Sequence, residues 1–347
     1  MFKASFQNDY SEGAHPDILK TLEKSNYASM VGYGEDPLCE KAKELIREQL
    51  GENRDSDIHF VAGGTQANLI CLRAMLKPYE SVIAATSAHI AVHETGAIEA
   101  TGHKINTVPT EDGKLRPEDV ISVIDAHEDE HMVLPRVIYL SNATEVGTIY
   151  HKEELEALHR VAKERDLLLF IDGARMGSAL TAGDNDLTLE DLTRLTDVFY
   201  IGGTKNGALM GEAILINNAS LKKHFRFHIK QTGALMAKGR VLGAQFTGLF
   251  QENLFFRLAK HANDRAEELK TGIKEEGYGF LSETTTNQIF PILPVNVVEQ
   301  LEKHYRFYRW AVVDEKHVAL RLVTSWATEK STIETFLKDL KEIAANA

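Results

Sequence analysis

Short apolar runs alternate with amphipathic helical patterns between residues 36 and 205 of this sequence. Helical patterns cover residues 36–51, 65–77 and 152–166, and the first of them ends at Gly51. Apolar runs that end in glycine or in polar residues occupy residues 57–64, 80–86, 135–142, 167–175 and 197–205. Strands separated by helices predict βαβ units and a mostly parallel sheet flanked by helices.

The last third of the sequence has a different character. From about residue 230, a glycine-spaced stretch leads into a long helical pattern, several short strand-like runs and a final helix. A chain of 347 residues is too long for one small core. We therefore expect a large α/β domain over residues 1–245, which includes the N-terminal segment, and a smaller C-terminal α+β domain over residues 246–347.

Composition and charge argue against several classes of protein. The net charge of −12 argues against a nucleic-acid-binding surface. No apolar run approaches the length needed to span a bilayer. Two cysteines, Cys39 and Cys71, without a signal-peptide pattern at the start, are typical of reduced thiols in the cytoplasm. We therefore expect a cytoplasmic protein that binds neither nucleic acid nor membrane.

Polar and small residues follow the predicted strands at the point where each strand ends. In parallel sheets flanked by helices, ligands bind beyond the carboxyl ends of the strands. We therefore expect one composite site at this edge of the sheet. The strand-end residues are Gly63, Gly64, Thr65, Ser87, His89, Ser141, Asn142, Asp172, Arg175, Thr204 and Lys205.

A site at the carboxyl-terminal edge of the sheet could bind a nucleotide or a metal ion, and we consider these two ligands first. The sequence contains no G-x-x-x-x-G-K-[ST] motif, and no G-x-G-x-x-G follows a strand and opens a helix. His89 and His93 have the i, i+4 spacing of metal ligands on a helix. A zinc hydrolase would also need a glutamate directly after the first histidine and a third ligand, and Ile90 occupies that next position. We therefore predict no nucleotide site and no metal ligands.

Lys205 is the residue that most restricts the chemistry. It follows the apolar run Val198–Ile201, and an ammonium rarely ends a buried strand unless it is paired or chemically used. A lysine whose head group snorkels to the surface is the alternative. Pyridoxal phosphate requires a lysine, a carboxylate for its pyridine nitrogen and donors for its phosphate. Lys205, Asp172 and the helix opening at Gly64 and Thr65 together supply these groups.

Six segments then carry a resemblance to a known family. They are "YGEDP" (33–37), "GGT" (63–65), "SAHI" (87–90), "DGAR" (172–175), the lysine in "GGTKNG", and "LRLVT" (320–324). In order and spacing they resemble the threonine aldolases, which belong with the aromatic β-eliminating lyases to the fold type I enzymes that use pyridoxal 5′-phosphate. The resemblance covers the chain from its N-terminus to near its end.

The resemblance implies roles for individual residues. It implies that Lys205 binds the cofactor covalently, that Asp172 contacts the pyridine nitrogen, and that His89 stacks on the ring; these three are the expected catalytic residues. The expected cofactor-binding residues are Gly64, Thr65, Gln66, His89, Asn142, Asp172, Arg175, Thr204 and Lys205. The expected substrate-binding residues are Asn8, Tyr33, His93, Arg175 and Arg321. Tyr33 is expected to reach the site of a neighbouring subunit in a homodimer or homotetramer.

The reaction implied by the resemblance is retro-aldol cleavage of a β-hydroxy-α-amino acid, such as L-threonine or L-allo-threonine, to glycine and an aldehyde. Relatives commonly carry a histidine in an "ENTHN" segment, and this sequence has Thr144 at its place in "SNATEVG". His89, His93 or a bound water then remain as candidate bases. A β-eliminating lyase and an aminotransferase are the alternatives that would use the same Lys205 and Asp172.

Overall fold

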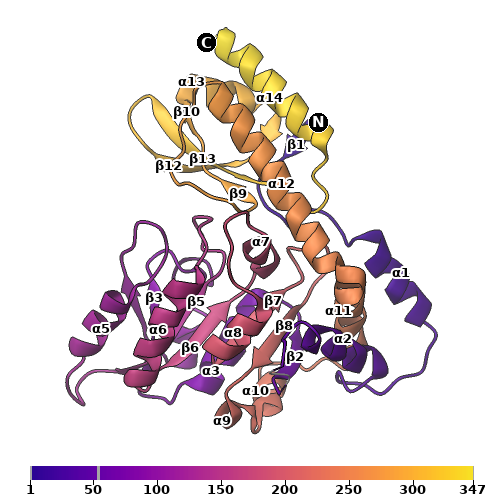
Figure 1. The fold of residues 1–347 in the computed structure, drawn as a ribbon, viewed down its shortest axis with the longest axis vertical. Coiled ribbons are helices and arrows are strands. Elements are labelled where there is room, and N and C mark those ends of the chain that lie inside the picture. Colours follow the sequence, from indigo (N-terminus) through magenta and orange to yellow (C-terminus); the bar gives the residue numbers. More distant parts are fainter. Residues whose placement is uncertain (1, 53–54, 347) are drawn as a thin grey trace.

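A seven-stranded sheet forms the centre of the larger part of the protein (Figure 1). The computed structural model describes residues 2–52 and 55–346. Five neighbouring strands run parallel, from β7 to β4, and β8 is antiparallel to both of its neighbours. The predicted mostly parallel sheet is therefore confirmed. In spatial order its strands are β2 (Asp57–Val61), β8 (Glu212–Ile216), β7 (Val198–Gly202), β6 (Leu168–Asp172), β5 (Leu134–Ser141), β3 (Glu80–Ala85) and β4 (Ile105–Val108).

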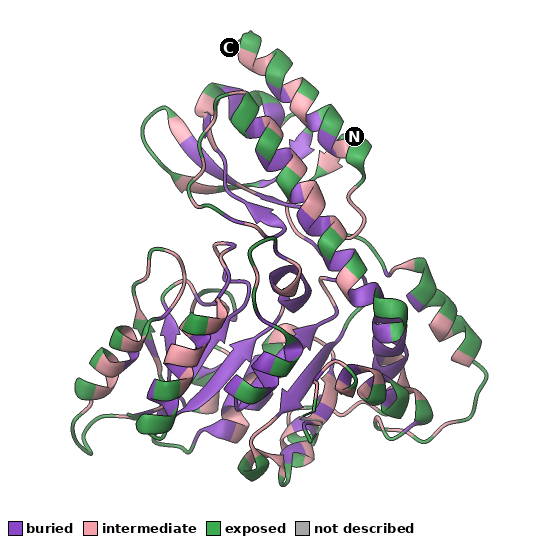
Figure 2. Cartoon of the chain, in the orientation of Figure 1, coloured by how far each residue is buried: buried purple, intermediate pink, exposed green. Residues whose placement is uncertain are grey.

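Helices cover both faces of this sheet, and its strands are therefore buried on both sides (Figure 2). Along β7 the side chains alternate, with Phe199 and Ile201 in one core and Val198 and Tyr200 in the other. The first core includes residues of α1 (Pro16–Ser25), α2 (Pro37–Arg47), α5 (Pro117–Asp125), α6 (Lys152–Glu164), α8 (Leu189–Leu195) and α11 (Arg240–Phe250). The second includes residues of α3 (Gly64–Met75) and α10 (Phe225–Gln231).

Short elements complete the larger part. Asp36 caps α2, since its side chain accepts hydrogen bonds from the backbone N–H groups of Leu38 (3.1 Å) and Cys39 (3.0 Å). The segment that carries His89 and His93 forms only a four-residue helix, with His93 as its C-cap. The remaining short elements are α4 (His89–Val92), η1 (Glu99–Thr101), α7 (Met176–Leu180), α9 (Ala219–Lys222) and η2 (Gln251–Asn253).

A second, smaller sheet lies with the C-terminal helices at the other end of the molecule (Figure 1). The long helix α12 (Leu254–Glu275) runs from the larger part into this smaller part. Antiparallel strands pack there against the helices, as the expected α+β domain requires. The elements are β9 (Gln288–Ile289), β10 (Ile292–Pro294), α13 (Val295–Leu301), β11 (Tyr305–Arg306), β12 (Tyr308–Val312), β13 (His317–Val323) and α14 (Lys330–Ala345).

The N-terminus lies with this smaller part. Strand β1 (Ala4–Ser5) pairs in parallel with β11, and Phe6 is buried in the small core against Phe336. The expected division after residue 245 falls inside α11. We propose that the chain nevertheless divides into two parts near this helix, with the N-terminal strand joined to the C-terminal part.

The carboxyl ends of the parallel strands meet the small sheet. In the register of β5 and β6, Ser141 lies opposite Asp172, and Lys205 follows β7 by three residues. Within residues 2–52 and 55–346, no helix combines the length and apolarity that crossing a membrane requires. The fold thus brings the predicted strand-end residues to one edge, beside β13 of the smaller part.

Candidate active site

A cavity of about 710 Å³ opens at this edge of the large sheet. Its size is in the range of small-molecule sites. Nine of the predicted site residues line it: Gly64, Thr65, His89, His93, Asp172, Arg175, Thr204, Lys205 and Arg321. The other lining residues are Tyr10, Ala62, Gly63, Glu145, Ala174, Tyr200, Glu212, Tyr308, Arg309 and Trp310.

Lys205 lies in the loop between β7 and β8 and lines the cavity. Burial lowers the pKa of Lys205, and the neighbouring charge of Arg175 lowers it further. No described residue accepts a hydrogen bond from its Nζ atom. An amine whose proton is held weakly, and which has no hydrogen-bonding partner, is suited to act as a nucleophile.

The carboxylate of Asp172 is held by four donors. Its Oδ1 atom accepts from the Tyr200 hydroxyl (2.5 Å) and the Ala174 backbone N–H (2.9 Å). Its Oδ2 atom accepts from the Tyr139 hydroxyl (2.5 Å) and from Asn68 Nδ2 (2.9 Å). Burial raises the pKa of both tyrosines well above the usual value, which keeps them as proton donors. Four hydrogen bonds thus hold this carboxylate in one orientation.

The amino end of α3 lies at the same cavity. Gly63 is the N-cap in extended conformation, and no described group accepts a hydrogen bond from the backbone N–H of Gly64 or Thr65. Free N–H groups and the helix dipole at such an end favour a phosphate. Gln66, a predicted cofactor residue, does not line the cavity, because its Oε1 atom accepts from the Ala62 backbone N–H (3.0 Å).

His89 is bonded to a buried carboxylate that the sequence did not reveal. Its Nδ1 atom lies 2.9 Å from Glu94 Oε1, and the Glu94 side chain is fully buried. This hydrogen bond raises the pKa of His89. Asn68 links the two carboxylates, since its Nδ2 atom also donates to Glu94 Oε1 (2.8 Å). His93 lies on the more exposed side, with its ring centroid 5.6 Å from that of His89.

Two of the three arginines that line the cavity, Arg175 and Arg321, were predicted as site residues, and they come from different parts of the molecule. Arg175, which precedes α7, is buried and forms an ion pair with Asp9 near the N-terminus. Arg321 of β13 donates from Nε (3.1 Å) and Nη2 (2.7 Å) to Gln288 Oε1, and its Cζ atom lies 5.5 Å from the centre of the Trp310 ring. Two guanidinium groups in one cavity are suited to bind a carboxylate.

Glu212, at the start of β8, is a further acidic residue in the cavity. Its Oε1 atom accepts from the Thr204 hydroxyl (2.8 Å), and Oε2 accepts from the Gly203 backbone N–H (3.1 Å). Burial raises the pKa of Glu212 to about 8. The sequence contained a signal for it, because an acidic residue directly before the apolar run "AILI" is as unusual as Lys205 after its own strand.

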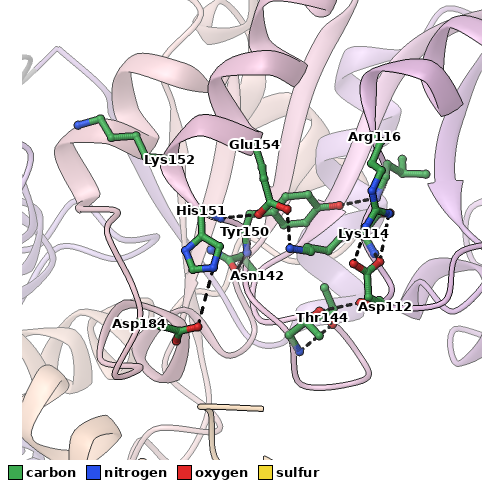
Figure 3. Close-up of polar contacts among 12 residues, drawn as sticks. Asp112, Lys114, Arg116, Asn142, Thr144, Tyr150, His151, Lys152, Glu154 and Asp184 are labelled. Atoms are coloured by element: carbon green, nitrogen blue, oxygen red, sulfur yellow. Dashed lines mark hydrogen bonds and ion pairs between the residues drawn. The ribbon is translucent and has the colours of Figure 1, made fainter. Parts of the chain in front are cut away.

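Besides Gln66, three predicted residues lie outside the cavity lining. Asn8 Oδ1 accepts from the Tyr10 backbone N–H (3.0 Å) and the Ser11 hydroxyl (2.8 Å), and the next residue, Asp9, provides the contact to Arg175. Asn142 is buried beside Tyr150, whose backbone N–H donates to Asn142 Oδ1 (3.2 Å; Figure 3). Tyr33 is exposed and lies under the amine of Lys230, 4.8 Å from its ring centre.

These residues fit pyridoxal phosphate. The cavity combines a free amine, a buried carboxylate bonded to a cavity-facing hydroxyl, and a helix end with free N–H groups, which are the three groups that this cofactor needs. Among the residues that the structure describes, no group of three or more histidine, cysteine, aspartate and glutamate side chains could hold a metal ion.

Comparisons with known proteins agree with this geometry. Residues 23–294 match the family model for beta-eliminating lyases. A low-specificity L-threonine aldolase from a Pseudomonas species is 33% identical over 344 residues, which cover 97% of each chain. The structure of a threonine aldolase from Leishmania major superposes with a TM-score of 0.96 at 48% identity, over 98% of this chain and 99% of that one. An aspartate aminotransferase from Thermus thermophilus, at 15% identity and a TM-score of 0.71, shares the fold alone.

Proposed function

We infer the activity from the family to which this chain belongs, the beta-eliminating lyases. The protein is a carbon–carbon lyase that depends on pyridoxal 5′-phosphate, of the threonine aldolase type. Its substrate is a β-hydroxy-α-amino acid, L-threonine or L-allo-threonine, which it cleaves to glycine and an aldehyde. One observation supports this activity above all others: Lys205, Asp172 and Arg321 line the same cavity.

The cofactor, when bound, supplies a ring that accepts the electron pair left on the substrate Cα. In this proposal Lys205 binds the cofactor through its amine, and Asp172 stabilises the positive charge of the pyridine nitrogen. The N–H groups of Gly64 and Thr65 would hold the phosphate, and Thr204 lines the same cavity. Two of the four donors to Asp172, the Tyr200 hydroxyl and the Ala174 backbone N–H, belong to residues that also line the cavity.

Arg321 is proposed to bind the α-carboxylate of the substrate. Gln288 already occupies its Nε edge, so Nη1 remains for the substrate. Arg175 uses Nε and Nη2 for Asp9, and its Nη1 atom is likewise available to the substrate carboxylate or to the cofactor hydroxyl. A carboxylate held at this position fixes the orientation of the Cα–Cβ bond relative to the ring, which is the main requirement for cleaving that bond selectively.

The test of this function is product analysis on the purified holoenzyme. Glycine and acetaldehyde should form in equal amounts from L-threonine or L-allo-threonine, without any added keto acid. The cofactor should give a visible absorption band that changes when substrate is added. Amino transfer that depends on a keto acid, with no glycine formed, would exclude the aldolase assignment and favour the aminotransferase.

We also propose that the enzyme is a cytoplasmic homodimer or homotetramer with shared active sites. Two buried cysteine thiols, both free, support a reducing compartment. Tyr27 and Val31, in the same segment of the chain as Tyr33, are also exposed, which supports a contact with another subunit there. If Tyr33 acts in the partner's site, mixed oligomers of inactive Lys205→Ala and Tyr33→Ala chains should regain activity. If it acts within its own chain, mixing should restore nothing.

A further inference from the structure

The loop after β5 forms a tight turn that presents Glu145 to the cavity. The Gly147 backbone N–H donates to the Thr144 carbonyl (3.0 Å), and the Thr144 N–H donates to the Thr148 carbonyl (2.9 Å). Glu145 therefore occupies the second position of a four-residue turn. Glu145 lines the cavity together with Lys205.

Thr144, which occupies the place of the histidine in related sequences, faces away from the cavity. It is buried, does not line the cavity, and its hydroxyl lies 2.7 Å from that of Thr148. The Thr148 hydroxyl in turn donates to the Asp112 carbonyl (2.7 Å), which places Thr144 within the polar cluster of Figure 3. The neighbouring Glu145 is thus the residue of this pair that lines the cavity.

Contacts to the smaller part hold the turn in position. Gln288 Nε2 donates to the Thr144 carbonyl (3.3 Å), while Gln288 Oε1 accepts from Arg321. The Thr286 hydroxyl donates to the Gly147 carbonyl (2.9 Å). Glu145 is therefore fixed relative to the arginine proposed to bind the substrate carboxylate.

The carboxylate of Glu145 is free to accept a proton. No described residue donates a hydrogen bond to it, and its negative charge acts on Lys205, Arg175 and Arg321. Two other proton-accepting groups of the cavity, Glu212 and His89, are less suitable. Both oxygens of Glu212 already accept hydrogen bonds, and the hydrogen bond to Glu94 raises the pKa of His89 and favours its protonated form.

We propose that Glu145 accepts the proton of the substrate β-hydroxyl during cleavage, a step that rests on the proposed retro-aldol function. The O–H bond breaks and the proton moves to a Glu145 oxygen. The O–H electron pair forms the carbonyl bond of the aldehyde, and the pair of the Cα–Cβ bond stays with Cα. A proton then adds to Cα to give glycine, and this proton balances the one that Glu145 took from the β-hydroxyl. The hydroxyl becomes strongly acidic as the C–C bond breaks, and a carboxylate is then a sufficient base.

The experiment separates this step from the chemistry that the cofactor performs at Cα. Glycine has no β-hydroxyl, so exchange of its α-hydrogen with deuterium, followed by NMR, does not need Glu145. In Glu145→Gln we expect threonine cleavage to fall by about 100-fold or more, whereas glycine exchange changes less than about threefold. The affinity for glycine, measured from the visible absorption on titration, should stay unchanged. Glu145→Asp should recover part of the cleavage rate.

Glu128→Gln, at an exposed glutamate outside the cavity, removes the same charge and serves as the control. Unchanged cleavage in Glu145→Gln, or an equal loss of cleavage and glycine exchange, would overturn the assignment. A selective loss of cleavage in His93→Asn but not in Glu145→Gln would overturn it in favour of His93. The proposed function itself fails if the wild-type enzyme exchanges glycine but cleaves no β-hydroxy amino acid. That result is seen in the wild type and the failure of the Glu145 assignment is seen only in the variants, so the two failures are distinguishable.

Discussion

Arg175 and Asp9 form a buried two-point ion pair that joins the N-terminal segment to the active-site cavity. Arg175 Nε lies 2.8 Å from Asp9 Oδ2, and Arg175 Nη2 lies 3.1 Å from Asp9 Oδ1. Asn287 Nδ2 adds a third donor to Asp9 at 2.9 Å. Burial alone would raise the pKa of Asp9, but the charges of Arg175 and Lys205 hold it below its usual value. The pair thus fixes which part of the Arg175 guanidinium remains for ligands.

Asp9→Asn should therefore affect both stability and substrate binding. It leaves a buried guanidinium without its counter-ion, and we expect the free energy of unfolding to fall by about 3 kcal/mol. KM for the amino acid should rise because Arg175 is no longer held in place. Chemical unfolding and steady-state kinetics measure the two effects. Asn8→Ala is the control, since Asn8 only caps a local turn, and an equal effect in both variants would contradict this role for Asp9.

The residues around the cavity show which parts of the site the sequence could predict and which it could not. Asp172 and Lys205 could be predicted because each ends an apolar run, and parallel strands carry their ends to one edge. Asp9 could not be assigned, because its partner lies 166 residues away and β1 is only two residues long. The turn at residues 144–147 decides that Glu145 and not Thr144 faces the cavity, and sequence spacing contains no information on that orientation.

Lys205→Ala should abolish turnover and remove the covalently bound cofactor. Its amine is the only group proposed to form that bond, so no other residue can replace it. Borohydride reduction of the wild-type enzyme, followed by peptide mass spectrometry, should find the cofactor mass on the peptide that contains Lys205. Lys238→Ala, a lysine outside the cavity lining, is the control. Modification of another lysine, or turnover in Lys205→Ala, would disprove the assignment.

Asp172→Asn should retain the cofactor but lose most of the catalytic rate. The amide keeps the shape of the side chain but has no negative charge to stabilise a protonated ring nitrogen, and we expect kcat to fall at least about 100-fold. Bound cofactor is measured after its release by alkali, alongside kcat. Asp197→Asn changes another buried aspartate, at the opposite end of β7, and should leave kcat within about threefold. A near-normal rate in Asp172→Asn would mean that another group protonates the ring.

Arg321→Lys should weaken substrate binding more than it slows the reaction. The ammonium keeps the charge but cannot bond Gln288 and a carboxylate in the planar geometry of a guanidinium. We expect KM for L-threonine to rise by about 10-fold or more, with a smaller change in kcat. Arg309→Lys is the matched control, because Arg309 also lines the cavity but its guanidinium is paired with Glu302. Equal KM values for the wild type and Arg321→Lys would remove Arg321 from the substrate site.

Glu212→Gln should change how stability depends on pH. The pKa of Glu212 is raised by burial from 4.5 to about 8. Between these values the folded protein keeps a proton that the unfolded chain releases, so stability falls as pH rises and the loss is complete above about pH 8. A glutamine has no proton to lose, although it gives up the acceptor for the Gly203 N–H. Relative to the wild type, the Tm of Glu212→Gln should therefore rise by about 3 °C or more between pH 5 and pH 9. Glu128→Gln, which is exposed, should show no such change. An equal Tm difference at both pH values would mean that Glu212 is already ionised in the folded enzyme, held so by the charge of Lys205.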